Sequence, residues 1–412
     1  MASDRQAQGS RTVLPAPFDR LLLPIYIPSL IISACHTALL ILLPIYVVNL
    51  GFSAAIAALV VGARGLGLLL FDVPAGLIAS RFGDRVILIV GLTVMLGGTL
   101  VIGWVASPWL LGFGAFLIGA GFAAWMLGRQ LYIADHCEIH ETGRAVAAMA
   151  GLQRVGFLIG PGVGGVVAEA TSYSLTFLSA AALIIVAAGF AISFSRATGE
   201  HAIASSLSLG PTFRIMRNHA RIFATAGSAA LSLQLMRATR MLLIPLFGIQ
   251  LGLDAAAIGL IYSISAAIDM CLFYPVGVIV DRHGRKWSAV PSLLMFALGL
   301  LLLPLATSFW SLLVLACGLG FANGLGTGVV MIIGTDLSRG AEDRSQFLGV
   351  WRLIGDVGMS GAPLLSAALV SVASLAAASI VVAVLGFGGA VIMLALVPET
   401  LTRAKAEPAE LT

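Results

Sequence analysis

The sequence predicts an all-α membrane protein, with twelve transmembrane helices in two pseudo-symmetric six-helix bundles. Of its 412 residues, 59% are hydrophobic and only 10% are charged, whereas a soluble domain carries about a quarter charged residues. A membrane-spanning helix needs roughly 20 apolar residues, and the chain contains twelve stretches of about that length. Basic residues gather in alternate loops, and the two halves of the chain repeat one another. These observations together indicate the fold class.

Apolar stretches follow one another with short polar loops between them. The longest polar interruption runs from Arg196 to Arg221, with six stretches on each side. We therefore expect an N-terminal bundle over residues 1–195, a cytoplasmic linker over 196–219 and a C-terminal bundle over 220–412. The predicted spans are 22–48, 55–80, 86–106, 109–133, 145–169, 174–194, 220–250, 256–280, 287–306, 310–334, 346–370 and 375–397.

The distribution of Lys and Arg predicts the orientation in the membrane. Basic residues lie in the loops around Arg81, Arg144, Arg282 and Arg339 and in the central linker, whereas the intervening loops have none. By the positive-inside rule, the basic loops are cytoplasmic. The basic tails place both termini inside. The polar N-terminal residues do not resemble a cleavable signal sequence.

Corresponding positions of the two halves carry the same residues. Three residues of the first half recur 201 positions later, and a pair of aspartates has the same spacing. The matched pairs are Pro44 and Pro245, Gly51 and Gly252, Gly76 and Gly277, and Asp135 and Asp336. This internal duplication is expected of transporters built from two related bundles.

The loop after the eighth predicted span carries the most specific motif. It reads Gly277-Val-Ile-Val-Asp281-Arg282-His283-Gly284-Arg285-Lys286. Gly284 permits a tight turn, and Asp281 can accept hydrogen bonds from a neighbouring helix N-terminus. The alternative is a merely solvated basic loop. The order of residue types resembles the signature loop of the major facilitator superfamily, G-x-x-x-D-R-x-G-R-[KR].

This resemblance extends over nearly the whole chain. It implies the major facilitator fold, alternating access to a small-molecule substrate, and a cytoplasmic gating loop. Similarity to bacterial members of the family implies the bacterial inner membrane. The first-half loop keeps Gly76, Arg81 and Gly83, but Ser80 stands where the family has Asp and Asp84 where it has a basic residue. We expect a weaker gate contact on that side.

A glycine-proline motif lies in the fifth predicted span. Gly156 and Gly160 are four residues apart on one helix face and allow close helix packing, while Pro161 removes a backbone hydrogen bond. With Gly164 and Gly165, the segment resembles the antiporter motif of the drug:proton antiporter branch; ordinary glycine packing is the alternative. The family's arginine motif of the fourth span is missing, because Ala115 occupies its position.

Ionisable residues inside the predicted spans are the candidates for function, since such residues are costly in the bilayer and usually face the protein interior. Six arginines and three aspartates lie there, a balance that favours anionic or zwitterionic groups. The proton-coupling candidates are Asp269, Asp356 and Asp72. The substrate-cavity candidates are Arg154, Arg237, His36, Arg129 and Arg352. Structural pairing is the alternative for each; Arg352 and Asp356, four residues apart, can satisfy one another.

Two functions therefore remain open. One is proton-coupled efflux of small amphipathic compounds; the other is transport or exchange of organic anions or anionic lipids through an arginine-lined cavity. The sequence has no phosphate-binding loop, nucleophile elbow or metal-spaced His/Cys cluster. We therefore expect no enzyme activity, cofactor, metal or nucleic-acid partner. The expected partners are protons, the substrate and the lipid bilayer, and the expected state is a monomer.

Overall fold

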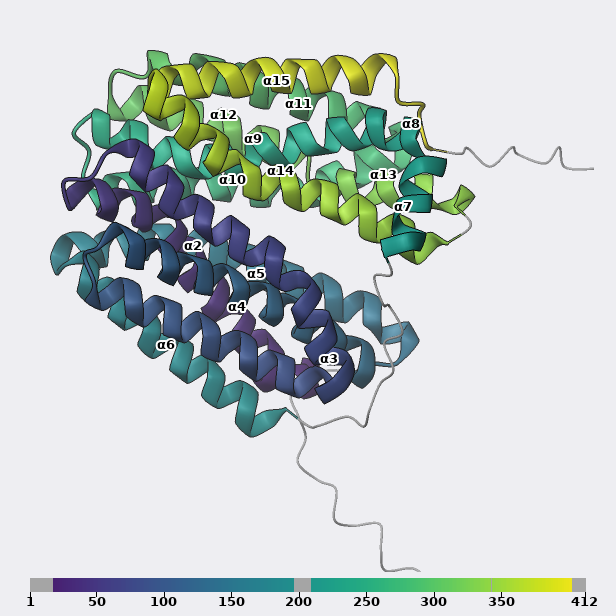
Figure 1. Cartoon of the computed structure of the whole chain (residues 1–412), viewed down its shortest axis with the longest axis horizontal. Coiled ribbons are helices and arrows are strands. Elements are labelled where there is room, and N and C mark those ends of the chain that lie inside the picture. The colour runs from purple at the N-terminus through teal and green to yellow at the C-terminus, as the bar shows by residue number, and fades with distance from the viewer. Residues whose placement is uncertain (1–17, 196–208, 342, 402–412) are drawn as a thin grey trace, which may run out of the picture. The chain divides into compact units, whose positions relative to one another are not determined.

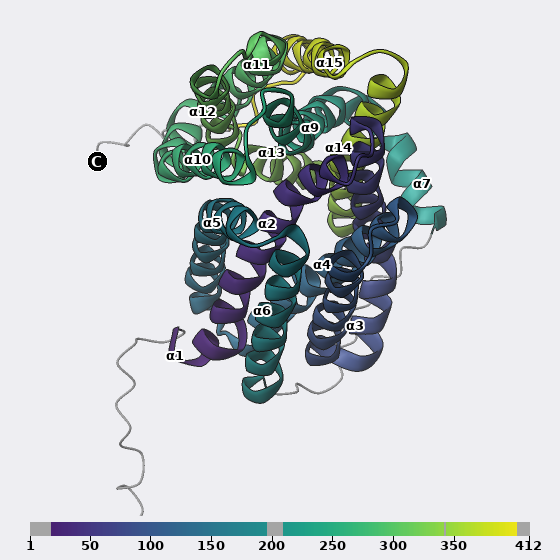
Figure 2. The same ribbon diagram turned by 90° about the vertical axis from the view of Figure 1, so that its left-hand side faces the viewer.

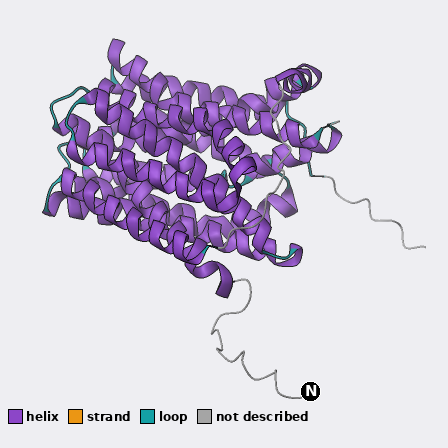
Figure 3. Cartoon of the chain, turned by 60° about the horizontal axis from the view of Figure 1, so that its bottom comes forward, coloured by secondary structure: helices purple, strands orange, loops and turns teal. Residues whose placement is uncertain are grey.

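The computed structural model describes residues 18–195, 209–341 and 343–401 (Figure 1). All regular elements in these ranges are helices, joined by short loops (Figure 3). Eleven helices of the described chain are long and apolar enough to cross a membrane. Residues 196–208 of the predicted linker lie outside the described ranges, and the rest of the linker begins with a short amphipathic helix, α7 (Leu209–Asn218).

The helices follow the predicted spans closely. The first half contains α1 (Phe18–Leu21), η1 (Leu22–Tyr26), α2 (Ile27–Asn49), α3 (Ala54–Trp104), α4 (Pro108–His136), α5 (Ile139–Ala170) and α6 (Tyr173–Phe194). The second half contains α8 (Ala220–Ile222), η2 (Phe223–Gly227), α9 (Ser228–Gln250), α10 (Ala255–His283), α11 (Lys286–Leu302), η3 (Leu303–Leu305), α12 (Phe309–Leu325), α13 (Val329–Leu337), η4 (Ser338–Gly340), α14 (Arg344–Val372) and α15 (Leu375–Ala395).

Helix α3 contains two of the predicted spans, 55–80 and 86–106. Its 51 residues would extend about 76 Å as one straight helix, far more than the roughly 30 Å of a hydrocarbon core. The helix changes direction at Gly83, whose φ of 86° and ψ of 175° are not helical. The connection that the sequence predicts as a loop is therefore a break at one glycine, and the prediction of twelve spans is confirmed.

The tenth predicted span, 310–334, is broken rather than continuous. Helix α12 ends at Leu325 and α13 begins at Val329. Gly328 in the break has a φ of 72°, a left-handed conformation that costs glycine little and other residues more. The break leaves carbonyl groups at the end of α12 without helical partners.

A local irregularity repeats at the offset found in the sequence. The π-helical segments η1 (Leu22–Tyr26) and η2 (Phe223–Gly227) lie 201 positions apart, each just before the long helix that opens its half. π-Helical turns are rare and usually require a specific structural reason. The duplication is therefore visible in backbone conformation as well as in residue identity.

The chain divides into two compact units. Unit 1 contains residues 1–39 and 66–204, and unit 2 contains residues 40–65 and 205–412. Within unit 2, α9, α11, α12 and α15 lie side by side (Figure 2). The beginning of α3 packs on α14 in this unit, where the Ser360 hydroxyl donates to the carbonyl of Gly65 at 2.9 Å. The bundle boundaries that the sequence predicts, at 195 and 220, stay a prediction.

Candidate functional site

A polar cluster surrounds the break between α12 and α13 in unit 2. Asp269 lies at the midpoint of α10, and its Oδ2 accepts a hydrogen bond from the side-chain amide of Asn323 at 2.9 Å. The Thr327 hydroxyl, inside the break, lies 2.9 Å from the carbonyl oxygen of Asn323 and 3.4 Å from Oδ1 of Asp269. Because a hydroxyl has one proton, it can serve only one of these acceptors fully at a time.

Arg237 of α9 contacts the backbone of the same break. Its Nη2 donates to the carbonyl oxygen of Gly326 at 2.6 Å, and its Nη1 donates to Oε1 of Gln234 at 2.7 Å. Gly326 is the first residue after α12, so its carbonyl lacks a helical donor. The guanidinium therefore supplies a hydrogen bond that the broken helix needs.

Two serines of α11 donate hydrogen bonds to carbonyl groups at the end of α12. The Ser292 hydroxyl donates to the carbonyl of Ala322 at 2.7 Å, and the Ser288 hydroxyl donates to the carbonyl of Leu325. The last turn of α12 is thus held by side chains from both α9 and α11. These bonds stabilise a defined break rather than a frayed end.

Two arginines are buried without a carboxylate partner among the described residues. Arg240, on α9, is 4% exposed; its Nη1 donates to the carbonyl of Leu319 at 3.0 Å and its guanidinium lies 5.2 Å from the ring centroid of Tyr262. Arg129, on α4 of unit 1, is 1% exposed and donates to Oε1 of Gln153 at 2.7 Å. Since neutral acceptors leave the charge in place, each unit carries a buried positive charge.

The structure places the other predicted candidates on α2, α3, α5 and α14. His36 of α2 is buried and stacks on Phe122 at 3.7 Å between ring centroids. Arg154 of α5 and Asp72 of α3 are half-buried in unit 1. Arg352 and Asp356 form a 3.6 Å ion pair along α14, as their spacing predicts, and the Arg352 side chain is 53% exposed.

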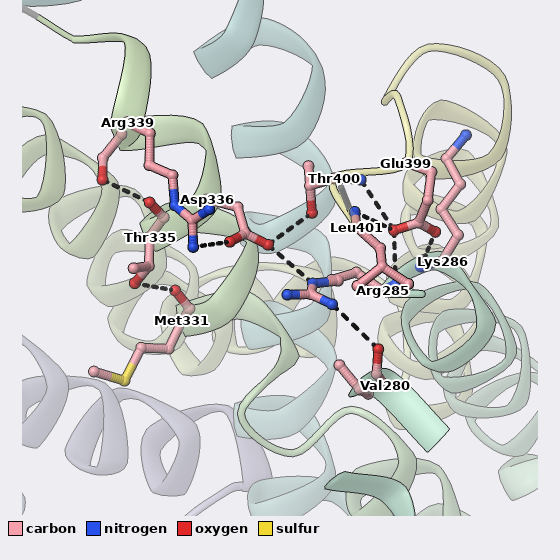
Figure 4. A network of polar contacts seen from close by, with 11 residues as sticks. Val280, Arg285, Lys286, Met331, Thr335, Asp336, Arg339, Glu399, Thr400 and Leu401 are labelled. Atoms are coloured by element: carbon pink, nitrogen blue, oxygen red, sulfur yellow. Dashed lines mark hydrogen bonds and ion pairs between the residues drawn. The ribbon is translucent and has the colours of Figure 1, made fainter. Parts of the chain in front are cut away.

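The predicted gating loop lies between α10 and α11, where Gly284 ends α10 with a φ of 110°. Arg285 joins the loop to the end of α13: its Nε lies 2.9 Å from Oδ2 of Asp336, and both side chains are largely buried. The Thr400 hydroxyl donates to the same oxygen at 3.0 Å, and Arg339 lies 3.4 Å from the other oxygen (Figure 4). Asp336 is therefore the centre of a network that connects three segments.

Glu399, just after α15, fixes the start of α11. Its Oε1 accepts from the backbone N–H of Arg285 at 2.8 Å, and its Oε2 accepts from that of Lys286 at 3.0 Å. Two further backbone donors, Thr400 and Leu401, bind Oε1 at 2.9 and 3.1 Å (Figure 4). Partial burial raises the pKa of the Glu399 carboxyl, but these four donors outweigh burial and hold the pKa below its usual range.

The first-half loop has the opposite arrangement of charge. Asp84 occupies the position that corresponds to Arg285, and its buried carboxylate lies 3.7 Å from Nδ1 of His136 at the end of α4. In unit 2 the basic residue, Arg285, lies in the loop, and the acidic residue, Asp336, lies at the helix end. The expected basic residue is absent here, yet a contact between loop and helix end is present.

The glycine-proline motif lies on α5, which is α-helical through Pro161. A Cβ added at Gly156 would lie 2.6 Å from the Cβ of Ser33, and one at Gly160 would lie 2.9 Å from the carbonyl carbon of Ala34. Both distances are too short for a real side chain, so these glycines allow the backbones of α5 and α2 to approach closely.

The sequence analysis identified most charged members of these networks but missed the charged Glu399 and the uncharged Asn323, Thr327, Gln234 and Gln153. The glycine-rich run Gly318–Gly328 was an available signal for the helix break. Uncharged polar residues in an apolar span are too common to single out, and the Glu399 contact joins residues 114 positions apart.

Comparisons with known proteins agree with these observations. The family model of the Major Facilitator Superfamily matches residues 25–270 and 226–411. The chain is 25% identical over 304 residues to the Multidrug resistance protein MdtH of Klebsiella pneumoniae subsp. pneumoniae, covering 72% of this chain and 74% of that protein. The MdtH of an Enterobacter species is 26% identical over 269 residues, or 63% and 65% of the two chains.

Solved structures share the fold at low identity. A POT family transporter in complex with a thioalcohol-conjugated peptide aligns with a TM-score of 0.76 at 12% identity, over 90% of this chain and 94% of that chain. The nucleoside transporter NupG aligns with a TM-score of 0.76 at 15% identity, over 91% and 99% of the two chains. Both similarities concern the fold alone.

Proposed function

The chain belongs to the Major Facilitator Superfamily and is a multi-pass secondary transporter rather than an enzyme, and we propose that it couples efflux of small amphipathic compounds to proton uptake by alternating access. The observation that carries this proposal is the Asp269 carboxylate at the break between α12 and α13. In transporters, broken spanning helices at mid-membrane are where substrates and coupling ions bind.

Protonation of Asp269 would change the contacts that hold the break. The ionised carboxylate is an acceptor only and takes a hydrogen bond from Asn323. Once protonated, it loses its charge and acquires a donor, so the Asn323 bond weakens and the Thr327 hydroxyl can bond fully to the Asn323 carbonyl. The proton thereby alters the hydrogen bonds on which the joint of α12 and α13 depends, which is the step that coupling requires.

The efflux direction and the amphipathic substrate class rest on two further observations. The relatives that match most of the chain carry the name multidrug resistance protein. The glycine-proline segment of α5 resembles the motif of drug:proton antiporters. We further propose a bacterial inner membrane, which the bacterial relatives support, and cytoplasmic termini, which the basic loops support.

A second candidate function is transport of organic anions. Arg129 and Arg240 are buried, and among the described residues they bond only to neutral groups. An anionic substrate would compensate charge that the described protein leaves uncompensated. The two candidates differ in the charge of the transported compound.

The test uses purified protein in liposomes with an imposed pH gradient and a pH-sensitive dye inside. Lipophilic cations are added in one series and organic anions in the other. Proton movement with cations, lost in Asp269→Asn and kept in the matched control Glu169→Gln at the exposed end of α5, supports the proposal. Full proton coupling in Asp269→Asn would overturn the role of Asp269. Proton movement with anions alone, lost in Arg129→Gln, would replace the first candidate with the second.

A further inference from the structure

A cavity of about 500 Å³ lies at the basic end of unit 2, separate from the cluster around Asp269. The residues that line it come from three segments: the α8–η2 region, the start of α11, and the last residue of α15 with the chain just after it. They are Arg221, Ile222, Thr225, Lys286, Ala395, Leu396, Val397 and Pro398. The proposed proton coupling and substrate transport do not involve the residues of this cavity.

Two of the residues that line the cavity are cations, and none of the lining residues is an acid. Arg221 is exposed, and its side chain makes no hydrogen bond or ion pair with any described residue. The Lys286 ammonium donates to the carbonyl of Leu394 at 2.9 Å, which orients the side chain and leaves its charge in place. The nearby acid, Glu399, accepts from backbone N–H groups and keeps its own charge, so it offsets part of the positive charge. With two cations and one carboxylate, the cavity presents net positive charge.

The rest of the lining is mostly apolar and continues onto an exposed apolar face. Ile222, Ala395, Leu396 and Val397 line the cavity, and Leu396 is 59% exposed. On the last turns of α15, Leu394 and Val391 are 62% and 63% exposed, as expected of residues that face lipid tails. Trp287, next to Lys286, is 67% exposed, and exposed tryptophans of membrane proteins concentrate at the headgroup level.

We propose that this cavity binds the headgroup of an anionic phospholipid from the cytoplasmic leaflet. Arg221 and Lys286 contact the phosphate, and the acyl chains lie along the exposed face of α15. Charge complementarity selects an anionic headgroup, and the apolar face beside the cavity selects a lipid over a free anion. The positive-inside rule places this end of unit 2 in the cytoplasmic leaflet, and basic pockets at this level are typical headgroup sites.

A bound lipid would also join segments of the gating region. Lys286 is the first residue of α11 and part of the motif loop, whereas Arg221 and two further lining residues precede α9, and the other four lie at or just after the end of α15. A phosphate shared by Arg221 and Lys286 would hold the beginnings of the seventh and ninth spans together. The lipid is thus expected to stabilise unit 2 at its cytoplasmic end.

The test is native mass spectrometry of the full-length protein in detergent, which counts bound lipids and gives their affinities. Dioleoyl phosphatidylglycerol, dioleoyl phosphatidylcholine and inorganic phosphate are titrated separately. We expect one phosphatidylglycerol to bind more tightly than phosphatidylcholine, and Arg221→Gln to weaken that binding about fivefold. Arg217→Gln is the matched control, because this exposed arginine of α7 lies outside the cavity, and it should leave the affinity unchanged.

A second variant tests the cavity without changing its charge. Ile222→Trp fills part of the space and should also weaken phosphatidylglycerol binding. Equal affinity for the two phospholipids would overturn the proposal, as would equal loss in Arg217→Gln, which would indicate general attraction to a basic surface. Inorganic phosphate that displaces phosphatidylglycerol at equal concentration would show a free-anion site and reject the lipid.

Discussion

Glu399→Gln tests whether a single carboxylate after α15 holds the start of α11. The substitution keeps the size of the side chain and one carbonyl oxygen but removes the charge. In the wild-type protein, the carboxylate accepts from the backbone N–H groups of Arg285 and Lys286 at 2.8 and 3.0 Å. These are N-terminal groups of a helix, where a negative charge is favourable.

Glu399→Gln is expected to lower the local stability of the start of α11 by about 1 kcal/mol. Negative charge at a helix N-terminus contributes about 0.3–1 kcal/mol at exposed sites, and hydrogen bonds to charged groups exceed neutral ones by about the same amount. Glu399 is exposed, so solvent screening keeps the estimate at the lower end. A loss of about 1 kcal/mol corresponds to about fivefold faster local opening.

Hydrogen exchange of the protein in nanodiscs measures this opening. Peptides covering Arg285 and Lys286 should exchange about fivefold faster in Glu399→Gln than in the wild type at pH 7. Because the pKa of Glu399 is lowered, its contribution is present above the ordinary glutamate pKa of about 4.3 and is lost as the pH falls through the lower folded value. The difference between the two proteins should therefore disappear in strong acid.

Glu138 provides the matched control for this experiment. It precedes α5 at the N-cap position, where its Oε2 lies 3.4 Å from Nδ1 of His140, but it makes no capping hydrogen bond to a backbone N–H of the helix. Glu138→Gln removes a charge at a helix N-terminus without removing a cap, so it should change exchange at the start of α5 by less than Glu399→Gln changes exchange at the start of α11. Equal exchange in Glu399→Gln and the wild type at pH 7 would refute the capping role, and an equal effect of Glu138→Gln would show that the readout reports charge alone.

Two further predictions concern packing and the ion pair. Gly160→Ala should destabilise unit 1 by about 1–3 kcal/mol in reversible detergent unfolding, because the new methyl group meets the backbone of Ala34; Gly151→Ala on the same helix, where the added carbon meets open space, should change stability by less than about 0.5 kcal/mol. Arg285→Gln and Asp336→Asn should show a coupling of about 1–3 kcal/mol in a double-mutant cycle, since the pair is 2.9 Å apart and largely buried; additive losses would mean that the contact contributes no stability.

The number of spans was predictable because hydropathy and length alone determine it. The places where the chain turns were less predictable. The sequence predicts a loop between 80 and 86, and the structure has a break of one residue, Gly83, between the two helical parts of α3. A glycine at positive φ can change the direction of the chain within one residue. A hydropathy pattern indicates only that the surrounding residues are polar. The break after Leu325 was not predicted, because no run of polar residues accompanies it.

The candidate site was predictable in part. Asp269 and Arg237 stand out because charge is costly in a bilayer, and the structure brings both to the break after α12. Their partners were not predictable, because an amide or hydroxyl within an apolar span gives no indication of which helix it faces. Such contacts depend on the distances between helices. The repeat offset shows only which positions of the two halves correspond, and it gives no distance between helices.

The two motif loops show how a duplicated contact changes without being lost. Lys286 donates to the carbonyl of Leu394 at 2.9 Å, and Arg85, its counterpart, donates to the carbonyl of Ile192 at 2.9 Å. The neighbouring contact differs: Asp84 stands in the loop at the position of Arg285, and it contacts His136, the residue after the counterpart of Asp336. Arg285 Nε lies 2.9 Å from Asp336, within hydrogen-bond distance, whereas Nδ1 of His136 lies 3.7 Å from Asp84, beyond it. The substitution that makes the first loop depart from the family motif therefore replaces a hydrogen-bonded ion pair with a longer contact between the loop and the helix end.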